Sequence, residues 1–116
     1  MKTKSILVLI FYGIIILSCQ KDDLPATYPY EARVVGLNSD CGIYSIKIQK
    51  DLGKVESIVG STLDSIYIAQ NLPEEMQISG LEIVLDIREP KSNELGLCTF
   101  LGPSYNWLYV IRAKKK

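Results

Sequence analysis

The sequence predicts an all-β domain. Three observations support this prediction: apolar and polar residues alternate with a period of two after residue 30, turn-forming residues separate these runs, and only one short stretch has helical character. The chain of 116 residues is long enough for one domain with its own hydrophobic core.

Two segments show the alternation most clearly. In residues 43–49, Ile46 and Ile48 lie on one face of the predicted strand and polar residues lie on the other. In residues 81–88, every second residue from Leu81 onward is apolar and is expected to point inward. Further strands are predicted at residues 31–37, 66–70 and 106–113, with weaker candidates at 55–59 and 96–101.

The helical stretch spans residues 72–77, where Pro73 precedes Glu74 and Glu75. Proline suits the first position of a helix, and acidic residues suit the positive end of the helix dipole. This turn falls between two central strands, as in OB-like folds. We therefore predict a small OB-like closed or partly open β-barrel of five to seven strands with one short helical turn. A compact β-sandwich is the alternative, because it also covers the edges of its strands.

The first 30 residues have the features of an export signal followed by a linker. Lys2 and Lys4 precede an apolar run of about 12 residues at 6–17, which fits a secretory signal and is too short for a membrane-spanning helix. The linker contains Pro25 and Pro29, so it is expected to be extended. We predict a removed signal peptide at 1–18, a flexible tether at 19–30 and a single β domain at 31–113.

The end of the apolar run resembles the lipobox of bacterial lipoproteins, with the sequence Ile16-Leu17-Ser18-Cys19. The resemblance implies that Cys19 becomes the new N-terminus and carries lipid, with acyl chains such as palmitate anchoring it in a membrane. The next four residues, Gln20-Lys21-Asp22-Asp23, resemble the export signal of surface lipoproteins of the Bacteroidota. This implies a lipid-anchored outer-membrane protein at the cell surface, with a periplasm-facing orientation as the alternative.

Two further cysteines, Cys41 and Cys98, are expected to form a disulfide in an oxidising compartment. The bond would close a loop of about 57 residues, which is worth about 4 kcal/mol in the chain-entropy model. A reactive thiol would need a nearby base, and the chain contains no histidine. A metal site would need more ligands than two distant cysteines, so no metal or cofactor is expected.

Charge and composition argue against catalysis and against a nucleic-acid partner. Removal of residues 1–18 takes away two lysines and leaves 11 basic and 13 acidic residues, a net charge of −2. Nucleic-acid binding would need a basic stripe, and the terminal Lys114–Lys116 run is expected to be a solvated chain end. The lack of histidine removes most acid–base and triad chemistry, so we predict that the protein is not an enzyme.

The best binding candidate is an aromatic strand near the C-terminus. Tyr105, Trp107 and Tyr109 would share one face, and such rings can stack on sugars or other flat ligands. The opposite face carries Leu108 and Val110, so periodicity alone does not decide which side faces the core. The aromatic residues could equally pack in the core or cover an edge.

Ser65 is a candidate modification site. The sequence Asp64-Ser65-Ile66 resembles the short O-glycosylation sequon of the Bacteroidota, which would require Ser65 to be exposed. A turn residue that opens a strand is the alternative.

A longer pattern resembles small uncharacterised all-β lipoproteins of the Bacteroidota. It spans about residues 32–112 and consists of Tyr67 to Pro73 (YIAQNLP), Glu74-Glu75, Gly80-Leu81 and Val84, with Cys41 and Cys98 on either side. The resemblance implies a compact β domain and no assigned activity.

These features lead to the hypothesis of a non-catalytic, membrane-anchored envelope lipoprotein that acts as a binding or accessory module. Its expected partners are the membrane, through the N-terminal lipid, and an envelope protein or a glycan. The alternatives are a small inhibitor of a hydrolase and a glycan-binding module that uses the aromatic strand.

Overall fold

The computed structural model describes residues 27–99, 102 and 104–116. The predicted signal peptide, Cys19 and most of the predicted tether lie outside these residues. Among the described residues, no helix is long and apolar enough to cross a membrane.

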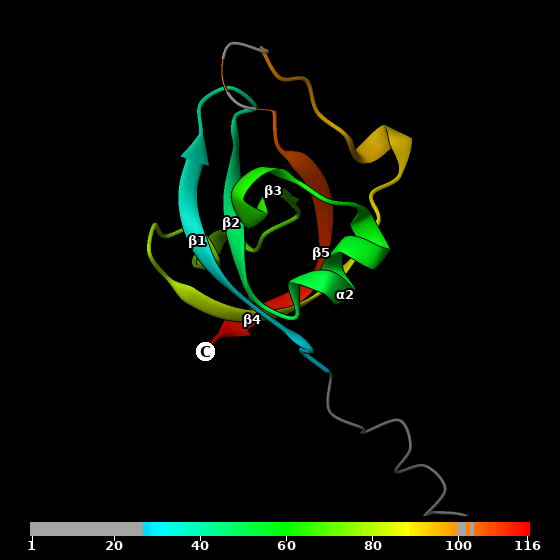
Figure 1. Ribbon diagram of the computed structural model, residues 1–116. Coiled ribbons are helices and arrows are strands. Elements are labelled where there is room, and N and C mark those ends of the chain that lie inside the picture. The colour runs from blue at the N-terminus through cyan, green and yellow to red at the C-terminus, as the bar shows by residue number, and fades with distance from the viewer. Residues whose placement is uncertain (1–26, 100–101, 103) are drawn as a thin grey trace, which may run out of the picture.

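Five strands form a closed barrel, so the barrel prediction is confirmed over the sandwich (Figure 1). The strands follow the order β1-β2-β3-β5-β4 around the barrel, and β4 pairs with β1 to close it. Strands β3 and β5 are parallel, and every other pair is antiparallel, as in an OB-like fold. The strands are β1 (Tyr30–Asn38), β2 (Ile43–Lys50), β3 (Ile66–Gln70), β4 (Glu82–Arg88) and β5 (Asn106–Lys115).

The barrel interior is filled by the apolar residues that the alternation predicts to point inward. Ile46 and Ile48 of β2 are buried, and so are Ile83, Leu85 and Ile87 of β4. Because adjacent residues of a strand point to opposite faces, polar residues between them lie on the outer surface. Other members of this core are Ala32, Val34, Tyr67, Ala69, Leu108 and Val110.

Strand β1 pairs with two neighbours, β2 and β4, and this requires a bend. The register with β2 shifts between Val34 and Gly36, as at a β-bulge. Gly36 has a φ of +150°, and a Cβ there would lie 2.9 Å from Ser79 Oγ. Glycine therefore allows both the bend and the close approach of the loop before β4.

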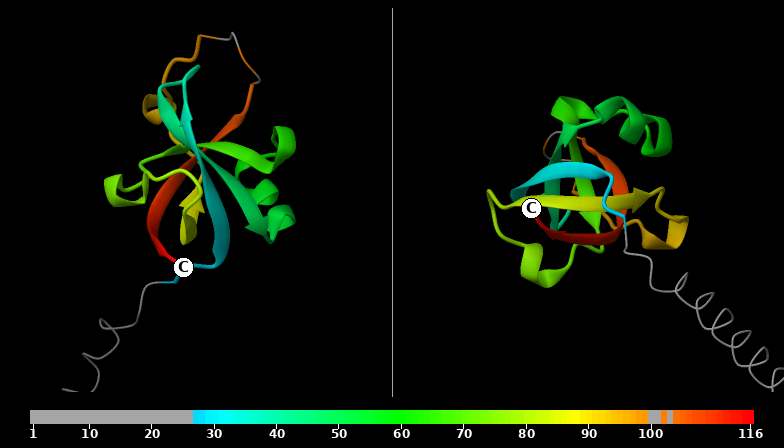
Figure 2. Two further views of the ribbon diagram at one scale, coloured as in Figure 1. Left: turned by 90° about the vertical axis from the view of Figure 1, so that its left-hand side faces the viewer. Right: turned by 90° about the horizontal axis from the view of Figure 1, so that it is seen from below.

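The weak strand predicted at 55–59 is wrong, because this segment belongs to helix α2 (Leu52–Val59), which lies outside the barrel (Figure 2). Val55 and Val59 are buried against the core and are four residues apart, as one helix face requires. Gly60 ends the helix with a φ of +90°, and its N–H donates to Glu56 O at 2.8 Å.

The predicted helical turn is confirmed as the short 3-10 helix η3 (Glu74–Met76), between β3 and β4. The weak strand predicted at 96–101 is absent from residues 96–99, which have irregular backbone. Two more 3-10 turns, η2 (Leu63–Ser65) and η4 (Ser92–Glu94), precede β3 and follow β4.

The two termini of the described chain lie at one end of the barrel (Figures 1 and 2). We call this the terminal end, where β1 begins at Tyr30 and β5 ends at Lys115. The backbones of Lys114 and Lys115 pair with Val84 and Ile83, so the lysine run is not a frayed chain end, and its side chains are solvated as expected. The β1–β2 turn and the start of β5 lie at the other end of the barrel.

Candidate functional site

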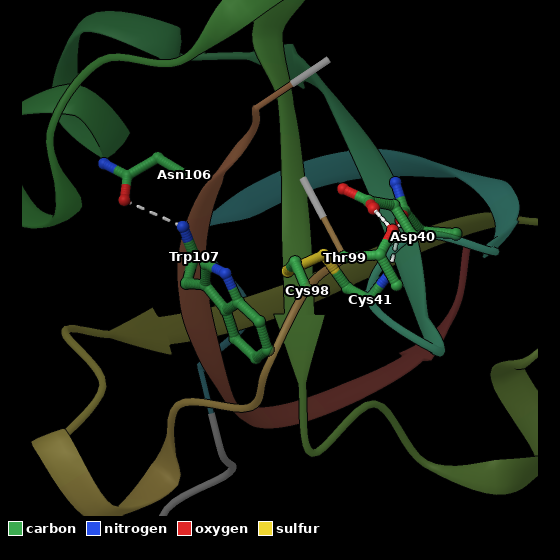
Figure 3. Close-up of a disulfide and its surroundings, with 7 residues drawn as sticks. Asp40, Cys41, Cys98, Thr99, Asn106 and Trp107 are labelled. Atoms are coloured by element: carbon green, nitrogen blue, oxygen red, sulfur yellow. Dashed lines mark hydrogen bonds between the residues drawn. A yellow bond between two sulfur atoms is a disulfide. The ribbon is translucent and has the colours of Figure 1, made fainter. Parts of the chain in front are cut away.

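The disulfide predicted from the sequence joins the β1–β2 turn to the long loop before β5. Cys41 and Cys98 are bonded with an S–S distance of 2.04 Å, across 57 positions of sequence (Figure 3). The turn has its own internal order, because the Cys41 N–H donates to Asn38 Oδ1 at 2.9 Å and the Gly42 N–H donates to Asn38 O at 2.7 Å. We call the turn and the described loop residues around this bond the disulfide end.

Hydrogen bonds beside the disulfide strengthen the same connection. The Thr99 N–H donates to Asp40 O at 2.9 Å, and the Thr99 hydroxyl donates to the Asp40 carboxylate (Figure 3). Each partner of these bonds is next to a bridged cysteine in the sequence. The turn and the loop are therefore held together by a covalent bond with two hydrogen bonds next to it.

The structure answers which face of the aromatic strand points inward. Leu108 and Val110 are fully buried in the barrel, so Trp107 and Tyr109 lie on the outer face, where both are half-buried. Tyr105 directly precedes β5 and is also half-buried. The aromatic side chains are therefore outside the core, beneath the loop that the disulfide holds.

Trp107 is placed at a cleft of about 290 Å³ beside the disulfide. Cys41, Cys98 and Tyr105 also line this cleft, and Leu97, which is 93% exposed, forms part of its rim. The loop contacts the ring closely, since a Cβ on Gly96 would lie 3.0 Å from Trp107 Cη2. No hydrogen bond from the indole N–H is found to any described residue, so this donor is available to a ligand.

Tyr109 does not line this cleft and lies beneath an ion pair. The Arg88 guanidinium lies 3.7 Å from the centre of the Tyr109 ring, a cation–π contact. Arg88 also donates two hydrogen bonds to the Glu94 carboxylate, at 2.8 and 2.7 Å. The structure thus brings Tyr105 and Trp107 together at the cleft and places Tyr109 beneath a charged pair.

In the Arg88–Glu94 pair, the pKa values of both side chains are shifted in the direction that favours their charged forms. The hydrogen bonds from Arg88, followed by one from the Lys91 N–H, lower the pKa of Glu94 to about 2. The same hydrogen bonding raises the pKa of Arg88. The pair therefore stays charged over the whole neutral range and fixes η4 against β4.

Asn106 fixes the start of the aromatic strand, and the sequence analysis did not single it out. Its amide Nδ2 donates to Val59 O at 2.7 Å, and its Oδ1 accepts from the Trp107 N–H at 2.8 Å (Figure 3). Its own N–H donates to Thr62 Oγ1 at 2.8 Å. The sequence gives no signal for these contacts, because Val59 and Thr62 lie more than 40 positions away from Asn106 in the chain.

Ser65 is half-buried and lies at the end of η2, directly before β3. It has a φ of +62°, and Asp64 before it is exposed and has a φ of +56°. This is the position of a turn residue that opens a strand. The predicted lipidation site, Cys19, lies outside the described residues.

Asp40, Cys41 and Cys98 bring three possible metal-ligating atoms within 4.8 Å of one another. Both sulfur atoms are used in the disulfide, so neither offers the thiolate that binds a metal. The Asp40 carboxylate accepts the Thr99 hydrogen bond. These residues therefore act as a structural connection in this state.

The fold and the cleft place the protein among small OB-like barrels with a disulfide-linked loop. Comparisons with protein-family models, with curated proteins and with solved structures found no significant match.

Proposed function

We propose that this protein is a non-catalytic envelope lipoprotein, anchored by lipid on Cys19, whose barrel binds a glycan at the cleft beside the disulfide. The observation that carries the proposal is the outward, half-buried position of Trp107 and Tyr105 at a cleft under a covalently held loop. An aromatic pair in such a position offers apolar area together with polar tips.

The chemistry of the cleft fits a sugar better than a purely apolar ligand. A sugar ring has an apolar face that stacks on an indole and hydroxyls at its edge that accept hydrogen bonds. The Trp107 N–H has no partner among the described residues, so it can donate to such a hydroxyl. The disulfide already holds Cys98 and Thr99 against the β1–β2 turn, so ligand binding does not have to immobilise these two residues.

The placement of the two ends supports the anchored part of the proposal. The chain enters the barrel at Tyr30, at the terminal end (Figure 1), and the cleft is lined by residues of the disulfide end. An extended tether from Cys19 to Tyr30 would reach at most roughly 40 Å. A lipid on Cys19 would thus keep the barrel within this distance of the bilayer, with the point of attachment at the terminal end and the cleft at the other end.

A glycan array probed with the purified full-length protein tests the binding part. We expect binding to at least one glycan, and we expect Trp107→Ala and Tyr105→Ala to weaken it at least about tenfold, because each removes a stacking surface. Tyr28→Ala is the matched control, since Tyr28 lies at the terminal end next to Lys114. Binding that both cleft variants leave unchanged would exclude this site.

The anchor is tested separately by mass spectrometry and fractionation. The protein extracted from membranes should begin at an acylated Cys19, and Cys19→Ser should release it from the envelope fraction. An intact Met1, or a Cys19→Ser protein that still sediments with envelopes, would contradict the lipoprotein assignment.

A further inference from the structure

A second hollow, of about 740 Å³, lies on the outer face of β1 and β2. We call it the cationic groove. None of the described residues that line it is acidic, and its volume is in the range of small-ligand sites. Its side chains come from Arg33, Val35, Lys47, Gln49 and Ile66, with Gly80 at one edge.

Two positive charges in the cationic groove lie opposite each other, and neither forms an ion pair with a described residue. Arg33 and Lys47 are direct register partners across β1 and β2, and both are exposed. Like charges directly opposite on a sheet destabilise it. Neither side chain has an ion pair or hydrogen bond with any described residue. The fold carries an unfavourable pair here that a bound anion would relieve.

Acidic residues near the groove are directed elsewhere. Glu82 is the register partner of Arg33 on β4, but its carboxylate lies 4.0 Å from Lys116 Nζ. Glu31 pairs with Lys116 and Lys50 at the terminal end. The positive field of Arg33 and Lys47 is therefore open to a ligand.

The closed barrel limits how a ligand can be held in this groove. At the two cations both sides of each strand are paired, Arg33 with Lys47 and Glu82, and Lys47 with Arg33 and Ile66, so the backbone offers no free edge for an added peptide strand at this point. Recognition must come from side chains. The guanidinium and ammonium groups offer donors only, which suits carboxylates, and Gln49 adds an amide that suits hydroxyls.

One further hollow shares lining residues with both the cationic groove and the aromatic cleft. Val35 and Ile66 also line a neighbouring hollow of about 290 Å³ that reaches Tyr105. Tyr105 and Asp40 in turn line the cleft that contains Trp107. A linear ligand could follow this path from the cations to the aromatic rings.

We propose that the cationic groove is a subsite for the carboxylates of a linear acidic oligosaccharide built of uronic acids, bound by Arg33 and Lys47. This inference rests on the proposed glycan-binding function and names the class of glycan. Arg33 can hold a carboxylate through two parallel hydrogen bonds, and Lys47 adds a second charge. The sugar faces further along the chain would reach Tyr105 and Trp107.

Calorimetric titration of the purified full-length protein with hexagalacturonate and hexamannuronate tests this assignment. The fully methyl-esterified hexamers are the matched ligands, because they keep the sugar faces and lose the charge. We expect Arg33→Gln and Lys47→Gln each to weaken binding of an acidic hexamer about tenfold and to leave ester binding unchanged. Lys54→Gln, an exposed cation of α2, is the matched charge control and should bind like the wild type.

The outcomes separate this subsite from the proposed function. Equal binding of acid and ester forms, or acidic binding that neither groove variant weakens, overturns the subsite and leaves glycan binding at Trp107 intact. Acidic binding that depends on Arg33 and Lys47 but not on Trp107 supports the subsite and contradicts the aromatic cleft. Binding of neither hexamer, or tighter binding of hexaglutamate or oligothymidylate through the same cations, overturns the assignment to acidic glycans.

Discussion

The two ends of the barrel are held together by different interactions. At the terminal end, Glu31 forms ion pairs with Lys116 at 2.8 Å and with Lys50 at 3.7 Å. At the disulfide end, the Cys41–Cys98 bond and the Asp40–Thr99 hydrogen bonds fix the loop. Beyond the backbone pairing of the strands, the terminal end is thus linked by ion pairs, whereas the disulfide end is linked by a covalent bond.

This difference supports the proposed position of the binding site. The side chains of the terminal end satisfy one another, and exposed ion pairs of this kind contribute little and are screened by salt. At the disulfide end the covalent bond ties the described loop residues to the β1–β2 turn, and Trp107 and Tyr105 lie outside the core, half-buried at a cleft. Trp107 and Tyr105 therefore offer partly exposed rings beside a covalently held segment, which is the arrangement on which the proposed binding site rests.

The largest expected effect comes from removing the disulfide. We expect the double variant Cys41→Ser, Cys98→Ser to lose about 4 kcal/mol of unfolding free energy, because the unfolded chain regains the entropy of a long loop. Denaturant unfolding monitored by circular dichroism measures this loss. Reducing agent should destabilise the wild type and leave the double variant unchanged. A loss below about 1 kcal/mol would show that the bond does not hold this end.

A smaller loss is expected from Asn106→Ala. The variant leaves the half-buried carbonyl of Val59 without its donor and removes the acceptor of the Trp107 N–H, which should cost about 1–3 kcal/mol. Asn93→Ala, at an exposed position of η4, is the matched control. Equal unfolding midpoints for the two variants would contradict the role assigned to Asn106.

The Arg88–Glu94 pair predicts a pH dependence of stability. The folded-state pKa of Glu94 is about 2, below its ordinary value of 4.5, so its contribution is complete above about pH 4.5 and is lost as the pH falls toward 2. Glu94→Gln should melt at a lower temperature at neutral pH and show a weaker decline between about pH 5 and 2. Parallel melting curves of both proteins over this range would contradict the assignment.

The smallest effect is expected at the terminal end. The hydrogen bond and charge of Lys116 lower the pKa of Glu31, so its contribution is also present above the ordinary pKa and lost in acid. Glu31→Gln should lower the melting temperature less than Glu94→Gln does, and the difference from wild type should vanish in about 1 M salt. An effect larger than that of Glu94→Gln would contradict the ranking of these two ion pairs.

The strands of the barrel could be predicted from the sequence, because the alternation of apolar and polar residues is a local property of each strand. The sequence-based prediction failed for α2, where Val55 and Val59 are spaced for a helix face but the apolar segment is too short to distinguish a helix from a strand. It also left open the side on which Trp107 lies, because Leu108 and Val110 make the other face of the strand apolar too. Only the long-range pairing of β5 with β3 and β4 decides this.

The fluorescence of Trp107 tests most directly the claim that the disulfide end is the binding end. Trp107 is the only tryptophan of the chain, so its emission reports on this cleft alone. Titration with a broad glycan panel that includes the acidic hexamers should shift or quench the emission with saturation, and reduction of the disulfide should weaken the response. Emission that no glycan changes would contradict the account.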